Sequence, residues 1–400
     1  MNLKLCVLFG GKSVEHEISI ISAVQAMRHI NRDKYDVIPV YITKANEMYY
    51  GECLTSIEEF SNISALLKKC TKVTFTTENG KTYLRKLNTK LFGKAEITHV
   101  DMAFPIVHGT NCEDGTLHGY LAMMNLPIVG CGLTASAIGM DKYYMKTVFK
   151  DNGIPVLDCK CFTAKEFNEN ADAVISAIED KIPYPVIVKP VNLGSSVGIS
   201  KADNRDALLE ALRNAFNFAS KVLVEKAVQN LKEINCSVLG DCDDAEASEC
   251  EEPVGSDNIL SYEDKYTSGS KGGAKGGSKG MASLKRKIPA DITEEQRNTI
   301  RKMAVDAFKC LGCNGIVRID FMIDTVSGDI YLNEINTIPG SLSFYLWEPL
   351  GVKYTELLDR MIDLGKKRHR ESEEISYAFD TNVLEGMSFG GAKGAKGSKM

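Results

Sequence analysis

The hydrophobic pattern of the first hundred residues alternates between short apolar runs and one amphipathic stretch. Residues 3–9 form an apolar run that ends in two glycines, and residues 14–29 have the pattern of a helix. Residues 37–42 and 100–107 are further apolar runs of strand length. This order of strand, helix and strand predicts a doubly wound half-domain with a mostly parallel sheet.

The rest of the chain predicts two more α/β units. Their expected strands lie at residues 185–190, 222–226, 233–239, 316–323 and 330–336. We therefore expect an N-terminal domain at residues 1–130, a central domain at 131–224, a C-terminal domain at 225–370 and a tail at 371–400, which is the number of domains that 400 residues favour. No apolar run approaches the roughly 18 to 20 residues that span a bilayer, so no membrane segment is predicted.

The composition of the chain limits which partners it is expected to bind and in which compartment it is expected. The net charge of −5 disfavours bulk affinity for nucleic acid or an anionic membrane. The start of the chain does not have the pattern of a signal peptide, and the 12 cysteines indicate reduced thiols in a cytoplasmic protein. Residues 268–280 and 390–400 are rich in glycine and lysine but lack aromatic residues, which favours a mobile lid and a disordered tail over nucleic-acid binding.

Two stretches have the residues of a phosphate and metal site. Lys189 ends an apolar run that leads into a Gly/Ser-rich loop at residues 192–198, where backbone N–H groups and an ammonium can bind an anion. Asp320, Glu334 and Asn336 are hard oxygen donors of the kind that Mg²⁺ prefers. Glu334 and Asn336 are two residues apart on one strand, so they lie on the same face, and Arg318 shares a face with Asp320 in the same way.

Two other stretches allow simpler interpretations. Residues 224–228, followed by Glu233, can contact an adenine edge and ribose hydroxyls, or can be ordinary solvated surface. Residues 10–17 place Glu15 after a glycine turn, at the start of the predicted helix. Favourable interaction of the acid with the helix dipole explains that position without any function.

Six ordered motifs nevertheless resemble those of one family. They are GGKSVEHEISI, HGTNCEDGTLHGYL, GCGLTASAIGMDKYYMK, VIVKPVNLGSSVGISKA, YEDKY and GIVRIDF…YLNEINTIPG. In this order, over residues 1 to about 365, they are similar to the motifs of D-alanine–D-alanine ligases. The resemblance implies a three-domain ATP-grasp fold, in which an N-terminal doubly wound parallel sheet precedes two α+β domains that clasp ATP.

The resemblance also assigns roles to individual residues. ATP would be held by Lys142, Lys189, Glu225, Lys226, Val228, Glu233 and Lys265, and two Mg²⁺ (or Mn²⁺) by Asp320, Glu334 and Asn336. Glu15 would bind the first D-alanine and form a triad with Ser195 and Tyr266, with His108 beside that substrate. Arg318 and Gly340 would stabilise the oxyanion. The stretch after Gly340 departs from the family pattern, and Ser341 and Ser343 are its candidate contacts to the acceptor.

The implied reaction joins D-alanine to a second D-amino acid through an acyl phosphate, in the cytoplasm, for peptidoglycan precursors. Tyr266 favours an amine acceptor over D-lactate, because a histidine there could become cationic and repel an ammonium. A D-serine or other D-amino acid acceptor stays open, as does a non-catalytic ATP-binding protein, which would not require the full residue set. The resemblance also implies a homodimer, with no nucleic-acid or membrane partner.

Overall fold

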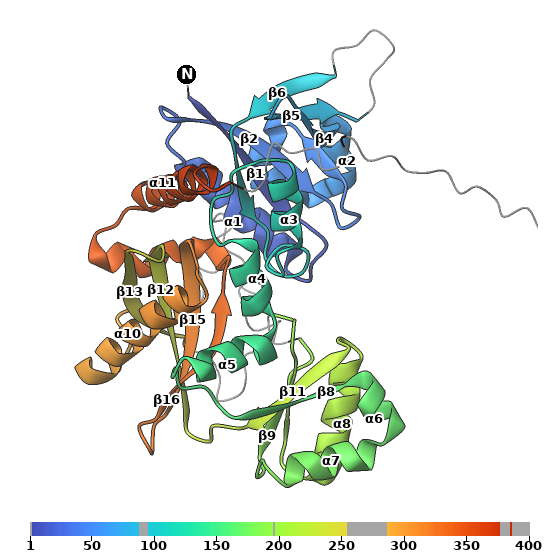
Figure 1. Cartoon of the computed structure of the whole chain (residues 1–400), viewed down its shortest axis with the longest axis vertical. Helices are drawn as coiled ribbons and strands as arrows, with labels where there is room; N and C mark the ends of the chain where they lie inside the picture. Colours follow the sequence, from blue (N-terminus) through green and yellow to red (C-terminus); the bar gives the residue numbers. More distant parts are fainter. Residues whose placement is uncertain (1, 88–94, 195–196, 254–285, 377–384, 386–400) are drawn as a thin grey trace, which may run out of the picture.

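The strands of the protein form three separate sheets, of seven, four and five strands (Figure 1). The computed structural model describes residues 2–87, 95–194, 197–253, 286–376 and 385. The Gly/Lys-rich segment at 268–280 and the tail beyond residue 385 lie outside the described residues.

The seven-stranded sheet contains β1 (Leu3–Gly10), β2 (Tyr35–Ile42), β3 (Met48–Tyr50), β4 (Thr71–Glu78), β5 (Lys81–Lys86), β6 (Glu96–Val100) and β7 (Met102–Ile106). Their order is β6-β5-β4-β3-β2-β1-β7, and β1 is parallel to both β2 and β7. All other neighbours are antiparallel. The prediction of a mostly parallel sheet was therefore wrong. Short turns such as Asn79-Gly80, between β4 and β5, can join only antiparallel strands.

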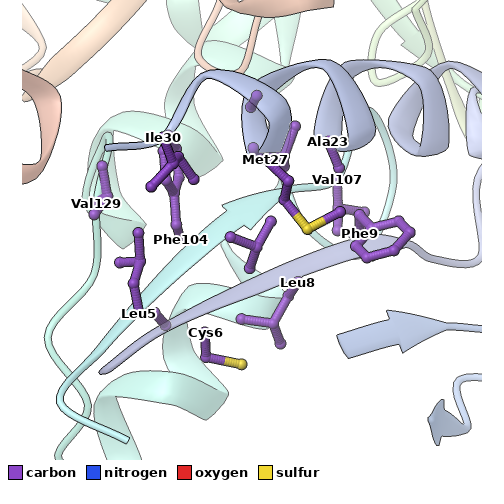
Figure 2. Packing of buried hydrophobic residues seen from close by; sticks show 14 of the residues in the cluster. Leu5, Cys6, Leu8, Phe9, Ala23, Met27, Ile30, Phe104, Val107 and Val129 are labelled. Carbon is purple, nitrogen blue, oxygen red and sulfur yellow. The ribbon is translucent and has the colours of Figure 1, made fainter. Parts of the chain in front are cut away.

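Helices α1 (His16–His29), α2 (Ile63–Lys69) and α3 (Thr116–Met123) belong to this unit, with two short 3₁₀ helices, η1 (Glu52–Thr55) and η2 (Ile57–Asn62). In Figure 2, Phe9 of β1 lies beneath Met27 and Ala23 of α1, whereas Cys6 and Leu8 point away from the helix. β1 is buried along most of its length, as expected for a central parallel strand. The C-terminal helix α11 (Tyr354–Glu373) adds its buried residues to the same core.

The four-stranded sheet contains β8 (Cys159–Thr163), β9 (Val186–Pro190), β10 (Ser200–Ala202) and β11 (Lys221–Lys226). Its order is β10-β9-β11-β8, and all neighbours are antiparallel. Helices α6 (Ala164–Glu169), α7 (Ala171–Glu179) and α8 (Arg205–Phe216) pack against it and form a core of their own.

The five-stranded sheet contains β12 (Leu231–Gly240), β13 (Ala245–Pro253), β14 (Arg286–Lys287), β15 (Gly315–Asp324) and β16 (Ile330–Asn336). Its order is β14-β13-β12-β15-β16, antiparallel throughout. Helix α10 (Glu294–Cys310) packs against it, and the 3₁₀ helices η4 (Gly340–Leu346) and η5 (Glu348–Leu350) follow its last strand. Within the described residues, no helix combines the length and the apolar character that crossing a bilayer requires.

Helices α4 (Leu133–Met140) and α5 (Lys142–Asp151) lie between the three sheets (Figure 1). Met145 and Phe149 of α5 are buried in the core of the five-stranded sheet, beside Ile319 and Leu332. The hydrophobic face of α5 thus packs on one sheet, which leaves its lysines to reach toward the neighbouring one. The domain limits at residues 130, 224 and 370 stay a prediction.

Candidate active site

A small cavity forms where the three units meet. It is lined by Glu15, Glu113, Gly139, Met140, Lys142, Leu193, Gly194, Glu334, Ile335, Asn336 and Thr337. Its volume is about 30 Å³, which holds a water molecule or two. This space is smaller than an amino acid or a nucleotide.

Glu15 reaches this cavity because of the turn between β1 and α1. Gly10 and Gly11 both have positive φ, of 95° and 86°, which favours glycine. The His16 ring then holds the turn, with Nδ1 lying 2.6 Å from the Gly11 carbonyl oxygen and Nε2 lying 2.9 Å from the Tyr41 hydroxyl. Glu15 is the residue just before α1, where the helix dipole favours a carboxylate.

Two glycine-containing loops approach the Glu15 carboxylate from other parts of the chain. A Cβ atom at Gly109 would lie 2.9 Å from Glu15 Oε2, and one at Gly194 would lie 3.1 Å from it. The motifs around residues 10–17, 108–115 and 192–194 are therefore brought together, although they are far apart in the sequence. Ser195 follows Gly194 but lies outside the described residues, as do Lys265 and Tyr266.

Glu113 is an acid of this site that the sequence prediction missed. Its side chain accepts hydrogen bonds from the backbone N–H groups of Gly109, at 2.6 Å, and Ile338, at 3.1 Å. Burial, and then repulsion from Glu15, raise the pKa of Glu113 to about 8. The acid lies in the HGTNCEDG motif, and the glycines on either side of it were the available signal.

His108 lies behind the cavity and does not line it. Its Nδ1 is 2.7 Å from the Ile338 carbonyl oxygen and its Nε2 is 2.8 Å from Ser22 Oγ. Burial lowers the pKa of His108 below its usual value, so a neutral ring donates to Ile338 and accepts from Ser22. Ser22 in turn accepts from the backbone N–H of Ser341, at 2.9 Å.

Ser341 and Ser343 are both fully buried in η4, which begins at Gly340. The Ser341 hydroxyl donates to Gln25 Oε1 at 2.8 Å, so it bonds to α1 and does not line the cavity. Ser341, Leu342 and Ser343 have φ angles of 52°, 51° and 49°, a left-handed turn that is strained for residues other than glycine.

The predicted metal ligands lie together on β15 and β16. Asp320 is directly opposite Glu334, and Arg318 is directly opposite Asn336. The Arg318 guanidinium donates to both oxygens of Asp320, at 2.7 and 2.8 Å, and Asn336 Nδ2 donates to Asp320 at 3.1 Å. An irregularity in the strand pairing follows Asp320 and leaves Asn333 without an opposite residue.

Two carboxylates and one amide suit Mg²⁺ only when other oxygen ligands complete the coordination. Within the described part of the chain, no group of three or more His, Cys, Asp or Glu residues is arranged to hold a metal ion. The residues fit a cation that is shared with phosphate oxygens better than one that is held by protein ligands alone.

Lysines from two other elements add positive charge, Lys142 within the cavity lining and Lys189 beside it. Lys142, at the start of α5, lies 3.2 Å from Glu334 and donates to the Leu193 carbonyl oxygen at 2.8 Å. Lys189, at the end of β9, lies 2.5 Å from Glu225 on β11 and donates to Asn333 at 3.1 Å. Lys189 thus connects the four-stranded sheet to the strand that bears Glu334.

Glu225 is a buried carboxylate between two ammonium groups. The second is that of Lys146, at 2.8 Å, a residue that the sequence prediction also missed. Burial alone raises the pKa of Glu225, but the attraction of Lys146 and Lys189 outweighs it and lowers the pKa to about 2. The signal in the sequence was the spacing of four residues from Lys142 to Lys146, which places both on one side of a helix.

The remaining predicted nucleotide contacts follow Glu225 on the connection to the five-stranded sheet. Lys226 is exposed at the end of β11, Val228 is half-buried in the connection, and Glu233 is exposed on β12. They lie along the connection from the four-stranded sheet to the five-stranded sheet.

The fold and the site together define an α/β enzyme whose charged site lies between three sheets. Two sequence models of protein families match the chain, "D-ala D-ala ligase N-terminus" over residues 4–131 and "D-ala D-ala ligase C-terminus" over residues 148–363. The chain belongs to the D-alanine–D-alanine ligase family.

Individual relatives are similar to this chain over nearly its whole length. The D-alanine–D-alanine ligase of Thermosipho melanesiensis is 40% identical, with 96% of this chain and 98% of the relative covered. Among solved structures, the D-alanine–D-alanine ligase of Coxiella burnetii has a TM-score of 0.75 at 29% identity, with 93% and 96% covered. The VanG D-Ala:D-Ser ligase of Enterococcus faecalis has a TM-score of 0.75 at 32% identity, with 91% and 100% covered.

Proposed function

We propose that this chain joins two D-alanines into D-alanyl-D-alanine at the expense of ATP, as a ligase of the ATP-grasp type. The observation that supports it most is that residues from three separate parts of the fold line one cavity: Glu15 before α1, Lys142 on α5, and Glu334 and Asn336 on β16. The near-full-length likeness to D-alanine–D-alanine ligases supports the choice of substrate.

The nucleotide would bind between the four-stranded and five-stranded sheets. Lys142 and Lys189 would bind its phosphates, while Glu225, Lys226, Val228 and Glu233 would border its adenosine. Two Mg²⁺ (or Mn²⁺), when bound by Asp320, Glu334 and Asn336, would neutralise charge on the transferred phosphate. The proposed domain limits are 1–130, 131–224 and 225–370.

The first D-alanine would lie against Glu15, whose carboxylate would pair with its ammonium. Its own carboxylate is a poor electrophile, so phosphorylation to an acyl phosphate would precede attack by the second amine. Arg318 pairs with Asp320 through Nε and Nη2, and it would stabilise the oxyanion with its other N–H groups. Gly340 and the buried hydroxyl of Ser343 would lie on the acceptor side.

Ser195 and Tyr266 keep their predicted role in closing the site, and Lys265 keeps its predicted contact to the ATP phosphates, although all three lie outside the described residues. A homodimer, a cytoplasmic location and a role in peptidoglycan precursor synthesis likewise stay predictions from the family.

The direct test measures phosphate and dipeptide together. Purified protein with ATP, Mg²⁺ and D-alanine should release one phosphate for each D-alanyl-D-alanine formed, and L-alanine should give neither product. Equal rates with the two enantiomers would overturn the proposed substrate.

A D-serine acceptor is the second candidate, since the VanG D-Ala:D-Ser ligase is among the similar structures and the stretch after Gly340 is unusual. Competition between D-alanine and D-serine for the acceptor position should yield mainly D-alanyl-D-alanine. Predominant D-alanyl-D-serine would replace the first candidate by the second.

A further inference from the structure

Glu225 bridges two lysines with its two oxygens. Lys189 Nζ lies 2.5 Å from Oε1, and Lys146 Nζ lies 2.8 Å from Oε2. All three side chains are buried, with exposed fractions of 6% for Lys189 and 2% for each of the other two. Two buried cations therefore share one buried anion, which leaves one positive charge in excess.

The two lysines differ in what else they can reach. Lys189 also donates to Asn333, on the strand that bears Glu334, so it already contacts both sides of the junction. Lys146 lies one helical turn deeper than Lys142, and within the described residues it pairs with no acid other than Glu225. Lys146 does not line the cavity.

An arriving phosphate changes the charge balance at this site. If Lys189 turns its ammonium to a nucleotide phosphate, its bond to Glu225 weakens. A buried carboxylate without a counter-ion is strongly unfavourable, so a simple Lys189–Glu225 pair would resist the nucleotide. A second cation, paired with the other oxygen of Glu225, removes the cost of leaving this carboxylate without a counter-ion.

We infer that Lys146 is a positioning residue for nucleotide binding, which keeps Glu225 neutralised while Lys189 leaves it for the phosphate. The inference rests on the proposed function in one respect, that Lys189 contacts the nucleotide. Lys146 itself touches neither substrate, and it acts only through Glu225.

The test replaces the ammonium by an apolar group of similar length. In Lys146→Met, the dissociation constant of ATP with Mg²⁺, measured by calorimetry without D-alanine, should rise tenfold or more. The KM for D-alanine should change less than twofold, because the effect is confined to the nucleotide. Lys150→Met, on the same helix but with Lys150 exposed, is the matched control and should bind ATP like the wild type.

Removing the charge of Glu225 as well distinguishes the proposed role of Lys146 in nucleotide binding from a merely structural role. In Lys146→Met/Glu225→Gln no anion is left to hold Lys189, so ATP affinity should return to within about threefold of Glu225→Gln alone. Lys146→Arg should also keep near-normal affinity. If Lys146→Met does not fold, Lys146→Gln applies the same test, since it keeps a polar side chain beside Glu225 and loses the charge.

The possible failures are distinguishable. Wild-type protein that does not bind ATP would overturn the proposed function and this inference together. Normal wild-type binding with unchanged affinity in Lys146→Met would overturn the inference alone. A double variant that binds ATP more than threefold more weakly than Glu225→Gln alone would also overturn it, because the defect would then not pass through Glu225.

Discussion

Glu334 lies opposite Asp320 on the neighbouring strand and 3.2 Å from the Lys142 ammonium. A change to glutamine keeps its size and removes its charge. We expect Glu334→Gln to lower kcat by about 10²-fold or more, the magnitude typical of losing one group that stabilises developing charge. The measurement is phosphate release under saturating ATP and D-alanine.

A matched variant controls for effects on the strand pair itself. Asp329→Asn removes an exposed carboxylate from the turn just before β16 and should leave kcat within about twofold, since this acid lies far from the site chemistry. Comparable losses in both variants would remove Glu334 from the proposed metal site.

Glu113 makes stability depend on pH in a definite direction. The folded protein keeps its proton up to about pH 8, whereas the unfolded chain loses it near the ordinary pKa of 4.5. The folded state therefore binds more protons between these values, and stability falls as the pH rises through this window. Glu15→Gln removes one cause of the raised pKa of Glu113, so the fall in melting temperature from pH 5 to pH 8 should shrink by about 2 °C or more.

Glu17→Gln is the control for that measurement, because Glu17 is on the same helix and pairs with Lys44 at the surface. Attraction to Lys44 lowers the pKa of Glu17 despite partial burial, so Glu17 stays mainly ionised over the pH range in which Glu113 makes stability fall. Its replacement should leave the pH dependence unchanged. An equal effect from both variants would contradict the coupling of Glu15 to Glu113.

At the scale of elements, the turn from β1 to α1 places Glu15, and it depends on Gly10. A Cβ atom there would lie 2.3 Å from the Ile42 carbonyl oxygen on β2, and the φ of 95° disfavours other residues. Gly10→Ala should destabilise the protein by about 3 kcal/mol or more, the sum of a backbone clash and an unfavourable φ. Thermal or urea unfolding measures the loss.

Gly80 offers the comparison, since it has a φ of 73° and an added Cβ would meet nothing within 4 Å. Gly80→Ala should show the φ effect alone, about 1 kcal/mol. Gly10→Ala as stable as Gly80→Ala would mean that the β1–α1 turn is not held closely against β2.

Several elements were predictable because their patterns are local. The strand expected at 330–336 is confirmed, and the helix expected at 14–29 begins two residues later, at His16. The strand expected at 100–107 divides at Asp101, because β6 pairs with β5 whereas β7 pairs with β1. The antiparallel part of the first sheet was missed, since which strands pair depends on distant contacts that a local pattern does not contain.

The residues of the candidate site were likewise predictable where their pattern is local and missed where it depends on the folded chain. Asp320, Glu334 and Asn336 were identifiable from alternation along strands, and the structure brings them together. Glu113 and Lys146 were missed because their importance arises from burial beside Glu15 and Glu225, which only the folded chain creates. Ser341 was expected at the acceptor, but its hydroxyl bonds to Gln25 of α1, a contact that sequence spacing does not reveal.

At the scale of the whole molecule, the end of the chain packs on its beginning. Helix α11 lies in the core of the first sheet, and Arg368 on it donates to the carbonyl oxygens of Ile128, at 2.6 Å, and Gly130, at 2.7 Å. This arrangement fixes the segment from which α4 and α5 begin. Lys142 and Lys146 are thereby held between the sheets that bear Glu334 and Glu225.

We propose that these groups activate a carboxylate by transferring phosphate to it. D-Alanine labelled with ¹⁸O in both carboxylate oxygens tests this directly. If an acyl phosphate forms and the second amine displaces phosphate, each dipeptide formed should be accompanied by one ¹⁸O atom in the released phosphate. Dipeptide formation with phosphate that contains no ¹⁸O would contradict an acyl phosphate intermediate.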